Sequence, residues 1–123
     1  MKYDLSVSES GAYILVRVKE PMTRTLARQI AIDLISLSSQ EGITRYLYDV
    51  RTAPNVESVV DNYEFANKDM KSVHATRKAH AAILVAPGDR SHDFTETVMR
   101  NAGYDVRLFV DDSEAVRWLE ESL

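Results

Sequence analysis

The amino-acid sequence predicts a single α/β domain over residues 1–123, built on a five-stranded mixed sheet that is mainly parallel, with helices chiefly on one face. The hydrophobic period switches repeatedly between about two and about 3.6 residues along the chain, which indicates alternating strands and helices. Single helical segments separate the later strands, and this spacing favours parallel pairing through crossovers. A chain of 123 residues, of which 45% are hydrophobic, can bury one core of ordinary composition.

The first two strands are predicted to form a hairpin, followed by a long helix. Residues 3–7 alternate between apolar and polar, as expected of a half-exposed strand. After a short turn, residues 13–18 (YILVRV) form the second strand. Thr23 can cap a helix that runs to about residue 39, and Gly42 lies just beyond its end.

The middle of the chain predicts a strand, a helix and a second strand. Residues 45–50 form the third strand, and Asn55 is a suitable N-cap for the second helix. The expected buried stripe of this helix consists of Val59, Tyr63, Ala66 and Met70. Residues 80–86 (HAAILVA) are apolar at both alternating positions, so we expect a central strand covered on both faces.

The last third of the chain predicts one more strand between two helices. A third helix is marked by Phe94, Val98 and Ala102 and ends at Gly103. Residues 105–110 form the fifth strand, and the final helix is anchored by Ala115, Trp118 and Leu119. Its N-cap is Asp111, Asp112 or Ser113. The resulting order is β-β-α-β-α-β-α-β-α.

One face of this sheet is predicted to be open. If neighbours in sequence are also neighbours in the sheet, every helix lies on the same face. The helix-facing set is then Ile14, Val16, Val18, Leu47, Val106, Leu108 and Val110. The opposite face carries Tyr13, Leu15, Arg17, Tyr46, Tyr48, Arg107 and Phe109. Interfaces favour such aromatic, leucine and arginine mixtures, so we expect a homodimer or a protein partner here. The alternative is that the N-terminal hairpin or a tail of the same chain folds across this face.

Composition excludes several classes of function. The chain has no cysteine, which rules out thiol catalysis, disulfides and thiolate metal sites. A net charge of −4 argues against a nucleic-acid partner. The first ten residues lack the apolar core of a signal peptide, and no apolar run is long enough for stable membrane insertion, so we expect a cytoplasmic protein. No phosphate-binding loop, nucleophile elbow or metal-ligand pattern is present, and we therefore expect neither a cofactor nor an enzyme.

Two loop residues are weak candidates for a polar site. Asp49 ends the third strand, where ligands of open α/β sheets gather. It could join Asp111 and Asp112 in an acidic site for magnesium or phosphate, but turn chemistry with its own loop is the simpler reading. Ser91, together with Gly88, could offer N–H groups to an anion.

The order of elements resembles the STAS superfamily, and specifically the small bacterial SpoIIAA-like proteins. The matching stretches are YLYDVR at 46–51, AAILVA at 81–86 and VRLFVDDSEAVRWLEE at 106–121. The most specific part is the pattern Phe-x-Asp-x-x-x-Ala-x-x-Trp-Leu in the last stretch. The resemblance covers nearly the whole chain, and its motifs are chiefly structural.

Together with the open sheet face, the resemblance implies a non-catalytic domain that acts through a homodimer or a protein partner in a regulatory or scaffolding role. Antagonist-type relatives are switched by phosphorylation of a serine after the third strand, and Ser58 falls at that spacing here. Glu57, Val59 and Val60 depart from the residues that flank the family's serine. Because STAS-type folds are distantly similar to Sec14-like lipid carriers, the alternative function is a binder of a small or lipid-like ligand, with its pocket between strand ends and helices.

Overall fold

The computed structural model describes residues 2–121, which form an α/β domain around one five-stranded sheet. The strands are β1 (Tyr3–Val7), β2 (Ile14–Val18), β3 (Arg45–Asp49), β4 (His80–Leu84) and β5 (Asp105–Phe109). They lie in the order β1-β2-β3-β4-β5, with β1 antiparallel to β2 and every other pair parallel. The predicted fold class is therefore confirmed, and strands that are neighbours in sequence are also neighbours in the sheet.

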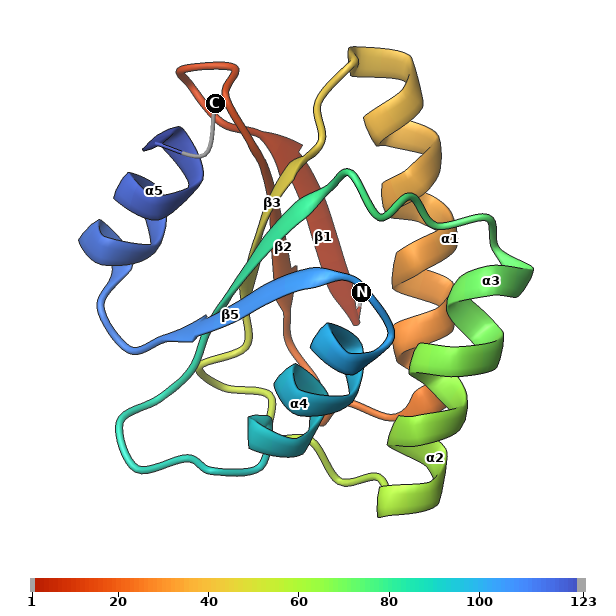
Figure 1. The fold of residues 1–123 in the computed structure, drawn as a ribbon. Helices are drawn as coiled ribbons and strands as arrows, with labels where there is room; N and C mark the ends of the chain where they lie inside the picture. The colour runs from red at the N-terminus through yellow and green to blue at the C-terminus, as the bar shows by residue number, and fades with distance from the viewer. Residues whose placement is uncertain (1, 122–123) are drawn as a thin grey trace.

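The helices lie chiefly on one face of this sheet, as predicted (Figure 1). They are α1 (Arg24–Glu41), α2 (Val59–Glu64), α3 (Met70–Ser72), α4 (Asp93–Asn101) and α5 (Asp112–Glu121), and the π-helix η1 (Phe65–Asp69) joins α2 to α3. Helices α1 to α4 cover one side, while α5 lies on the other (Figure 1). Within residues 2–121, no helix combines the length and the apolar character that crossing a membrane requires.

The ends of α1 are set by local chemistry that the sequence predicts. The Thr23 hydroxyl accepts a hydrogen bond from the Leu26 N–H at 3.1 Å, so Thr23 is the N-cap. Gly42 adopts a left-handed conformation (φ 69°) and its N–H donates to the Ser38 carbonyl at 2.8 Å. A residue with a side chain rarely adopts this conformation, which is why a glycine ends the helix here.

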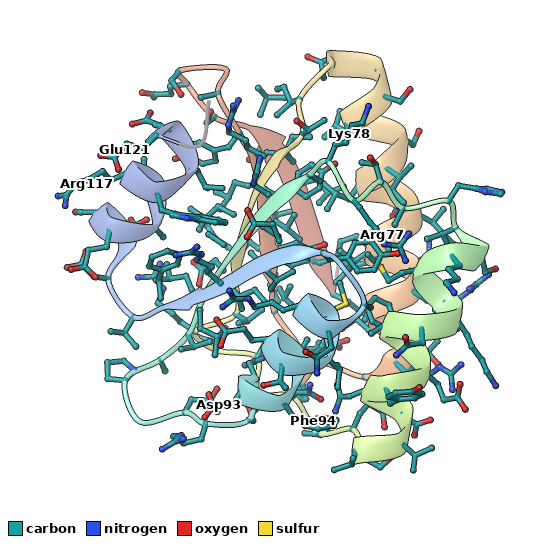
Figure 2. All side chains as sticks on the ribbon, in the orientation of Figure 1. Arg77, Lys78, Asp93, Phe94, Arg117 and Glu121 are labelled. Atoms are coloured by element: carbon teal, nitrogen blue, oxygen red, sulfur yellow. The ribbon has the colours of Figure 1, made fainter. Side chains whose placement is uncertain are left out.

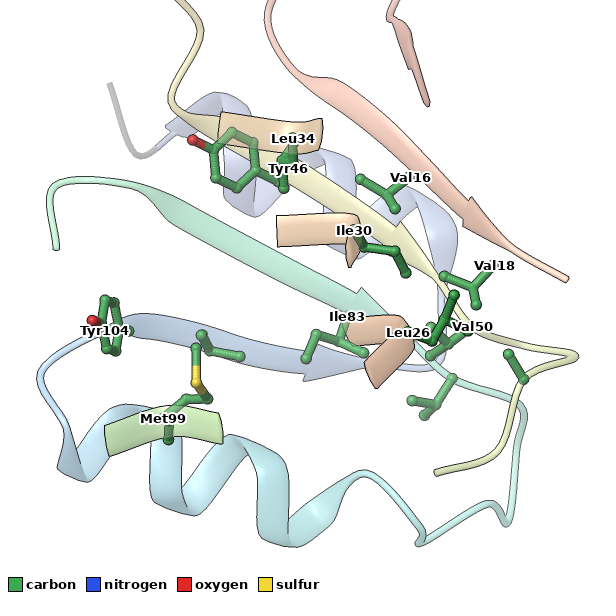
Figure 3. Close-up of a cluster of buried hydrophobic side chains, with 14 of the residues drawn as sticks. Val16, Val18, Leu26, Ile30, Leu34, Tyr46, Val50, Ile83, Met99 and Tyr104 are labelled. Atoms are coloured by element: carbon green, nitrogen blue, oxygen red, sulfur yellow. The ribbon is translucent and has the colours of Figure 1, made fainter. Parts of the chain in front are cut away.

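The main hydrophobic core lies between the sheet and helices α1 to α4 (Figure 3). Its largest fully buried side chains include Ile14, Val16 and Val18 of β2 and Ile30 of α1. A second, smaller cluster fills the opposite face, where α5 packs on β3, β4 and β5. Ile83 belongs to the first cluster, whereas Ala82 and Leu84 belong to the second. The expectation that β4 is central and covered on both faces is thus confirmed.

The expectation that all helices share one face is wrong for α5. Ala115 and Leu119 are fully buried against Leu47, Ala82 and Leu84 on the reverse of the sheet. The crossover rule places only helices that connect two parallel strands. Because α5 follows the last strand, this rule does not constrain it, and its apolar stripe packs on the face that the other helices leave free. The structure therefore agrees with the alternative, in which a tail of the same chain covers this face.

The predicted facing of β3 is also wrong. Tyr46 pairs in register with Ile14, and Tyr48 pairs with Val16, so both tyrosines face α1 to α4 with the main core. Leu47 belongs instead to the α5 side. Tyr46, Leu47 and Tyr48 are all apolar enough to lie on either face of the sheet. The alternation of side chains along the strand therefore did not indicate which of them face the main core.

Helix α2 begins later than predicted and exposes much of its expected stripe. Ser58, not Asn55, is the N-cap, and its hydroxyl accepts a hydrogen bond from the Asp61 N–H at 3.1 Å. Val59 and Tyr63 are 64% and 55% exposed, whereas Ala66 is fully buried. The buried side of this segment is thus supplied by η1 rather than by α2.

Candidate ligand cavity

A cavity of about 130 Å³ lies on the main-core face of the sheet, under helices α1 to α4. Its apolar lining comes from the sheet, α1, η1, α4 and the segment between α3 and β4. The lining residues discussed below are Arg24, Ala27, Ala31, Tyr46, Tyr48, Asn55, Glu57, Asp61, Asn62, Ala75, Ala79, Ala81, His92, Thr95, Tyr104 and Asp105. The cavity lies between the helix layer and the sheet.

Small side chains leave this space between the helices and the sheet. Ala27 and Ala31 are four residues apart on α1, so both lie on the side of the helix that faces the cavity. Ala75, Ala79 and Ala81 line it from the segment before β4 and from β4 itself. Larger aliphatic side chains at these positions would interdigitate and close the gap, as protein interiors usually do.

Tyr48 and Ala81 show that the space is internal. Both lie on central strands and face the helix layer, yet both are only half-buried. Because the helices cover this side of the sheet, their remaining accessible surface faces the cavity. Burial raises the pKa of Tyr48 strongly, so its hydroxyl stays protonated at neutral pH.

Asn55 connects the loops at the carboxyl ends of β3 and β4. Its side-chain amide donates to Asn62 and to Thr95, both at 2.8 Å. Its backbone N–H donates to the Ser91 hydroxyl at 2.9 Å, and its side-chain oxygen accepts from the Glu57 N–H at 2.9 Å. This network fixes the start of α2 next to α4 at the polar end of the cavity.

Arg24 ties α1 to the segment formed by α2 and η1. Its guanidinium group donates to both oxygens of Asp69, at 2.8 and 3.0 Å, and to Asp61 at 3.3 Å. The paired hydrogen bonds from Arg24 lower the pKa of Asp69, which is 8% exposed. The Arg24 N–H also donates to the Glu57 carboxylate at 2.7 Å. Arg24, Asp61 and Asp69 are therefore paired with one another, and Glu57 accepts a backbone N–H.

His92 is a buried histidine in the cavity lining. It is 3% exposed, and its Nε2 lies 2.9 Å from the Ala53 carbonyl, to which it donates as the neutral Nε2–H tautomer. Burial lowers the pKa of His92, although the carboxylates of Asp89 and Asp93 act in the opposite direction. The imidazole is consequently uncharged at neutral pH.

Three tyrosines in the lining differ in how their hydroxyls are used. The Tyr46 hydroxyl lies 2.8 Å from the Ser38 hydroxyl, beneath the part of α1 that carries Leu34 (Figure 3). The Tyr104 hydroxyl is sealed from solvent and makes no hydrogen bond within residues 2–121. The Arg77 guanidinium carbon lies 4.8 Å from the centre of the Tyr104 ring. Tyr48 likewise has no hydrogen-bond partner in the described part of the chain.

Five of the seven predicted interface residues lie on the α5 side of the sheet. Tyr13, Leu15 and Phe109 are half-buried and pack against the cluster beneath α5. Arg17 and Arg107 are exposed, and the Arg107 guanidinium carbon lies 5.3 Å from the centre of the Trp118 ring. The other two candidates, Tyr46 and Tyr48, lie in the opposite layer, so the seven residues do not form one surface.

The outer side of α5 is polar. Arg117 and Glu121 project away from the sheet, and both are exposed (Figure 2). Helix α5 therefore presents charged side chains outward and keeps its apolar side for the reverse of the sheet.

Asp49 and Ser91 take part in separate local networks. The Asp49 carboxylate accepts from the Arg51 backbone N–H at 3.2 Å and from the Arg51 guanidinium at 2.8 and 3.0 Å. These bonds lower the pKa of Asp49, and its own loop satisfies it in the way that turn chemistry predicts. Ser91 instead accepts from Asn55. Among residues 2–121, no group of three or more histidine, aspartate or glutamate side chains could hold a metal ion.

Ser58 is exposed at the N-terminus of α2, where its hydroxyl also donates to the Asp61 carboxylate at 3.1 Å. The structure thus gives it a capping role. Phosphorylation of Ser58 stays a prediction from the resemblance.

Sequence analysis did not identify the cavity or the burial of His92. His92 stands among polar residues before a helix, which resembles an ordinary surface loop. The first helix has alanines spaced four residues apart, and several more alanines occur around residues 75–82. Such a pattern indicates either close packing of the helix on the sheet or a gap between them. The sequence alone does not distinguish the two.

No protein-family model matches the chain, and no curated protein matches it. The resemblance to SpoIIAA-like proteins is therefore carried by the strand and helix motifs alone.

Proposed function

We propose that this chain is a non-catalytic SpoIIAA-like domain that binds a small, largely apolar ligand in the cavity under α1 to α4. The observation that carries the proposal is the cavity itself, about 130 Å³ of space lined mainly by apolar side chains. Ligand sites in proteins are typically concave and apolar, with a few polar groups that set orientation. Several of the polar groups, among them Asn55, His92 and Thr95, lie near the carboxyl ends of the parallel strands, where open α/β sheets place their ligands.

A binding role fits the chemistry around the cavity better than a catalytic one. Arg24 is engaged by Asp61 and Asp69, and Asp105 is paired with His80. Glu57 accepts the hydrogen bond from the first backbone N–H of α1. With these groups committed to other parts of the protein, none of the charged side chains in the described lining is held ready for proton transfer.

Toluene provides a direct test of the cavity. Titration into ¹⁵N-labelled protein should shift the amide resonances of β3, β4 and α1 in a saturable way. Ala81→Leu places a larger side chain in the cavity and should abolish these shifts. Ser36→Leu adds the same side chain at an exposed position of α1 and should leave them unchanged. A folded wild-type protein that gives no saturable shift with toluene would rule out the proposed function.

Partner binding is a second candidate, favoured by an exposed apolar patch on and just before α2. The patch consists of Val56, Val59, Val60 and Tyr63, whose exposed fractions are 59%, 64%, 66% and 55%. Val59 and Val60 lie four and three residues before Tyr63, so these three side chains share one side of the helix. Contiguous apolar surface of this kind commonly marks a contact with another protein, which could be a second copy of the chain or a regulatory partner.

Light scattering at micromolar concentration tests the homodimer form of this candidate. The wild-type chain should scatter as a dimer, and a Val60→Asp, Tyr63→Asp double variant should scatter as a monomer with an unchanged circular dichroism spectrum. Ile32→Asp alters an exposed apolar position on α1 and should remain dimeric. A monomeric wild-type protein at these concentrations would contradict self-association.

A further inference from the structure

The cavity has the size of a single ring. It offers about 130 Å³, and an apolar cavity of roughly 150 Å³ engineered into another protein stays dry and takes up benzene. A molecule of that size would lie against Tyr48 and Ala81, whose accessible surfaces face the space.

The described lining offers no free positive charge to an anionic occupant. The lining contains one basic side chain, Arg24, and three acidic ones, Glu57, Asp61 and Asp105. Each is engaged by another protein group. His92 is neutral and donates to the Ala53 carbonyl. An anionic ligand would therefore enter an apolar space without a free counter-charge, which costs several kcal/mol in proteins.

Tyr48 is the polar group in the lining that is both accessible and unpaired. The side chains of Thr23, Tyr46, Asn55, Asn62, Thr76 and Thr95 already take part in hydrogen bonds. The Tyr104 hydroxyl is unpaired but sealed from solvent. Buried tyrosine hydroxyls usually find a partner, so an accessible one without a partner in the described chain is a free donor.

We infer that the cavity binds a neutral molecule of about one aromatic ring that carries a hydrogen-bond acceptor, and that the Tyr48 hydroxyl donates to this acceptor. This inference rests on the proposed function of the cavity and adds the chemical class of the ligand. The apolar walls hold the ring, and Tyr48 sets which edge of the ring points toward β3. Tyr48 is thereby a specificity-determining residue.

Three probes of similar size separate the contributions of the ring, the hydrogen-bond acceptor and the charge to binding. Toluene has the ring without an acceptor, benzonitrile has the ring with a neutral acceptor, and benzoate carries a charge. Titrations followed by ¹⁵N-resolved NMR should give benzonitrile a roughly three- to tenfold lower Kd than toluene, the range expected of one net hydrogen bond. Benzoate should give no saturable shifts.

Two matched variants assign the preference to its residue. Tyr48→Phe removes the accessible hydroxyl and should bring the Kd of benzonitrile to that of toluene, with toluene binding retained. Tyr104→Phe removes the sealed hydroxyl and should leave the preference as in the wild type. Because each change removes only an unpaired hydroxyl, both variants should fold, and their ¹⁵N spectra verify this.

The outcomes distinguish this inference from the function on which it rests. Equal affinity of the wild-type protein for toluene and benzonitrile would overturn the role of Tyr48 and leave the cavity proposal intact. A preference for benzonitrile over toluene that persists in Tyr48→Phe, or that disappears in Tyr104→Phe, would also overturn the role of Tyr48 and leave the cavity proposal intact. Saturable binding of benzoate would overturn the requirement for a neutral ligand.

Discussion

Arg24 holds three segments of the chain together through one side chain and one backbone N–H. The side chain bonds Asp61 of α2 and Asp69 of η1, and the N–H bonds Glu57 in the preceding loop. Helix α2 has no buried residue, so these polar contacts and the Asn55 network hold it in place over the cavity. Loss of the guanidinium would leave the buried carboxylate of Asp69 with only the more distant Arg28, at 3.8 Å.

Arg24→Leu should lower the free energy of unfolding by about 1–3 kcal/mol, because a buried charged acceptor loses its best donor. Urea denaturation measures the change. Arg17→Leu is the control, since this arginine is 54% exposed and lies 4.0 Å from Asp49. Its loss should cost about 0.5 kcal/mol or less. Equal effects of the two variants would mean that Arg24 has no special role in holding α2.

His92 predicts a dependence of stability on pH. Because burial lowers the pKa of His92 in the folded state, the unfolded chain binds more protons once the pH falls below the ordinary histidine pKa of about 6.5. The contribution of neutral His92 is therefore fully present above that pH and is lost as the pH falls toward the lowered pKa. The slope is at most about 1.4 kcal/mol per pH unit.

Urea denaturation between pH 7.5 and pH 5.5, on the order of one unit either side of the histidine pKa, measures this slope. His92→Gln keeps an N–H donor for the Ala53 carbonyl and removes the titration, so the slope should flatten. Asp89 and Asp93, which act on His92, are present in both proteins. An unchanged slope in the variant would show that other groups cause the dependence.

At the scale of elements, α5 forms the second layer of the molecule. Its Ala115 and Leu119 are fully buried, and Trp118 packs 5.7 Å from the Phe109 ring. The Asp111 carboxylate caps the helix by accepting from the Ser113 N–H at 2.8 Å, which settles the choice that the sequence left open. A short helix placed in this way depends on its packing more than on its intrinsic helix propensity.

Leu119→Ala should therefore cost about 2–5 kcal/mol of unfolding free energy, the range for truncating a fully buried leucine. Arg117→Ala, on the exposed side of the same helix, should change it by about 0.5 kcal/mol or less. Thermal and urea unfolding compare the two. A small effect of Leu119→Ala would mean that α5 can leave the sheet at little cost.

Elements with a clear period and clear caps were predictable, and elements with ambiguous facing were not. Thr23 and Gly42 bound α1 as expected because capping is a local property. The facing of Tyr46 and Tyr48 depends on the register with β2, a long-range property. The buried stripe predicted from Val59 onward is not continuous, because η1 changes the helical period immediately after α2, at Phe65.

At the scale of the whole molecule, the order of strands followed from the sequence but the cavity did not. The hydrophobic period identifies each strand and helix in turn, and strands that follow one another in sequence usually lie side by side in the sheet. A cavity is a deficit of volume between layers, and alanines such as Ala31 and Ala81 produce either close packing or a gap according to how near the helices lie. Only coordinates distinguish these outcomes.

The cavity predicts sensitivity to pressure. Unfolding removes internal voids, so pressure should destabilise the wild-type protein with a negative volume change that scales with the void. Ala81→Leu should reduce the magnitude of this volume change, and it should also raise the unfolding free energy by about 0.5–2 kcal/mol where the side chain fits. High-pressure fluorescence measures both quantities. An identical volume change in the two proteins would argue against a cavity in solution.

The placement of Trp118 on α5 has a spectroscopic consequence. It is the sole tryptophan of the chain, and it lies on the side of the sheet opposite the cavity, in contact with the Phe109 ring. Its emission therefore reports the detachment of α5, whereas near-ultraviolet circular dichroism also has contributions from Tyr46, Tyr48 and Tyr104 in the other layer. Kinetic traces recorded with the two signals can time the loss of each layer separately, without an added label.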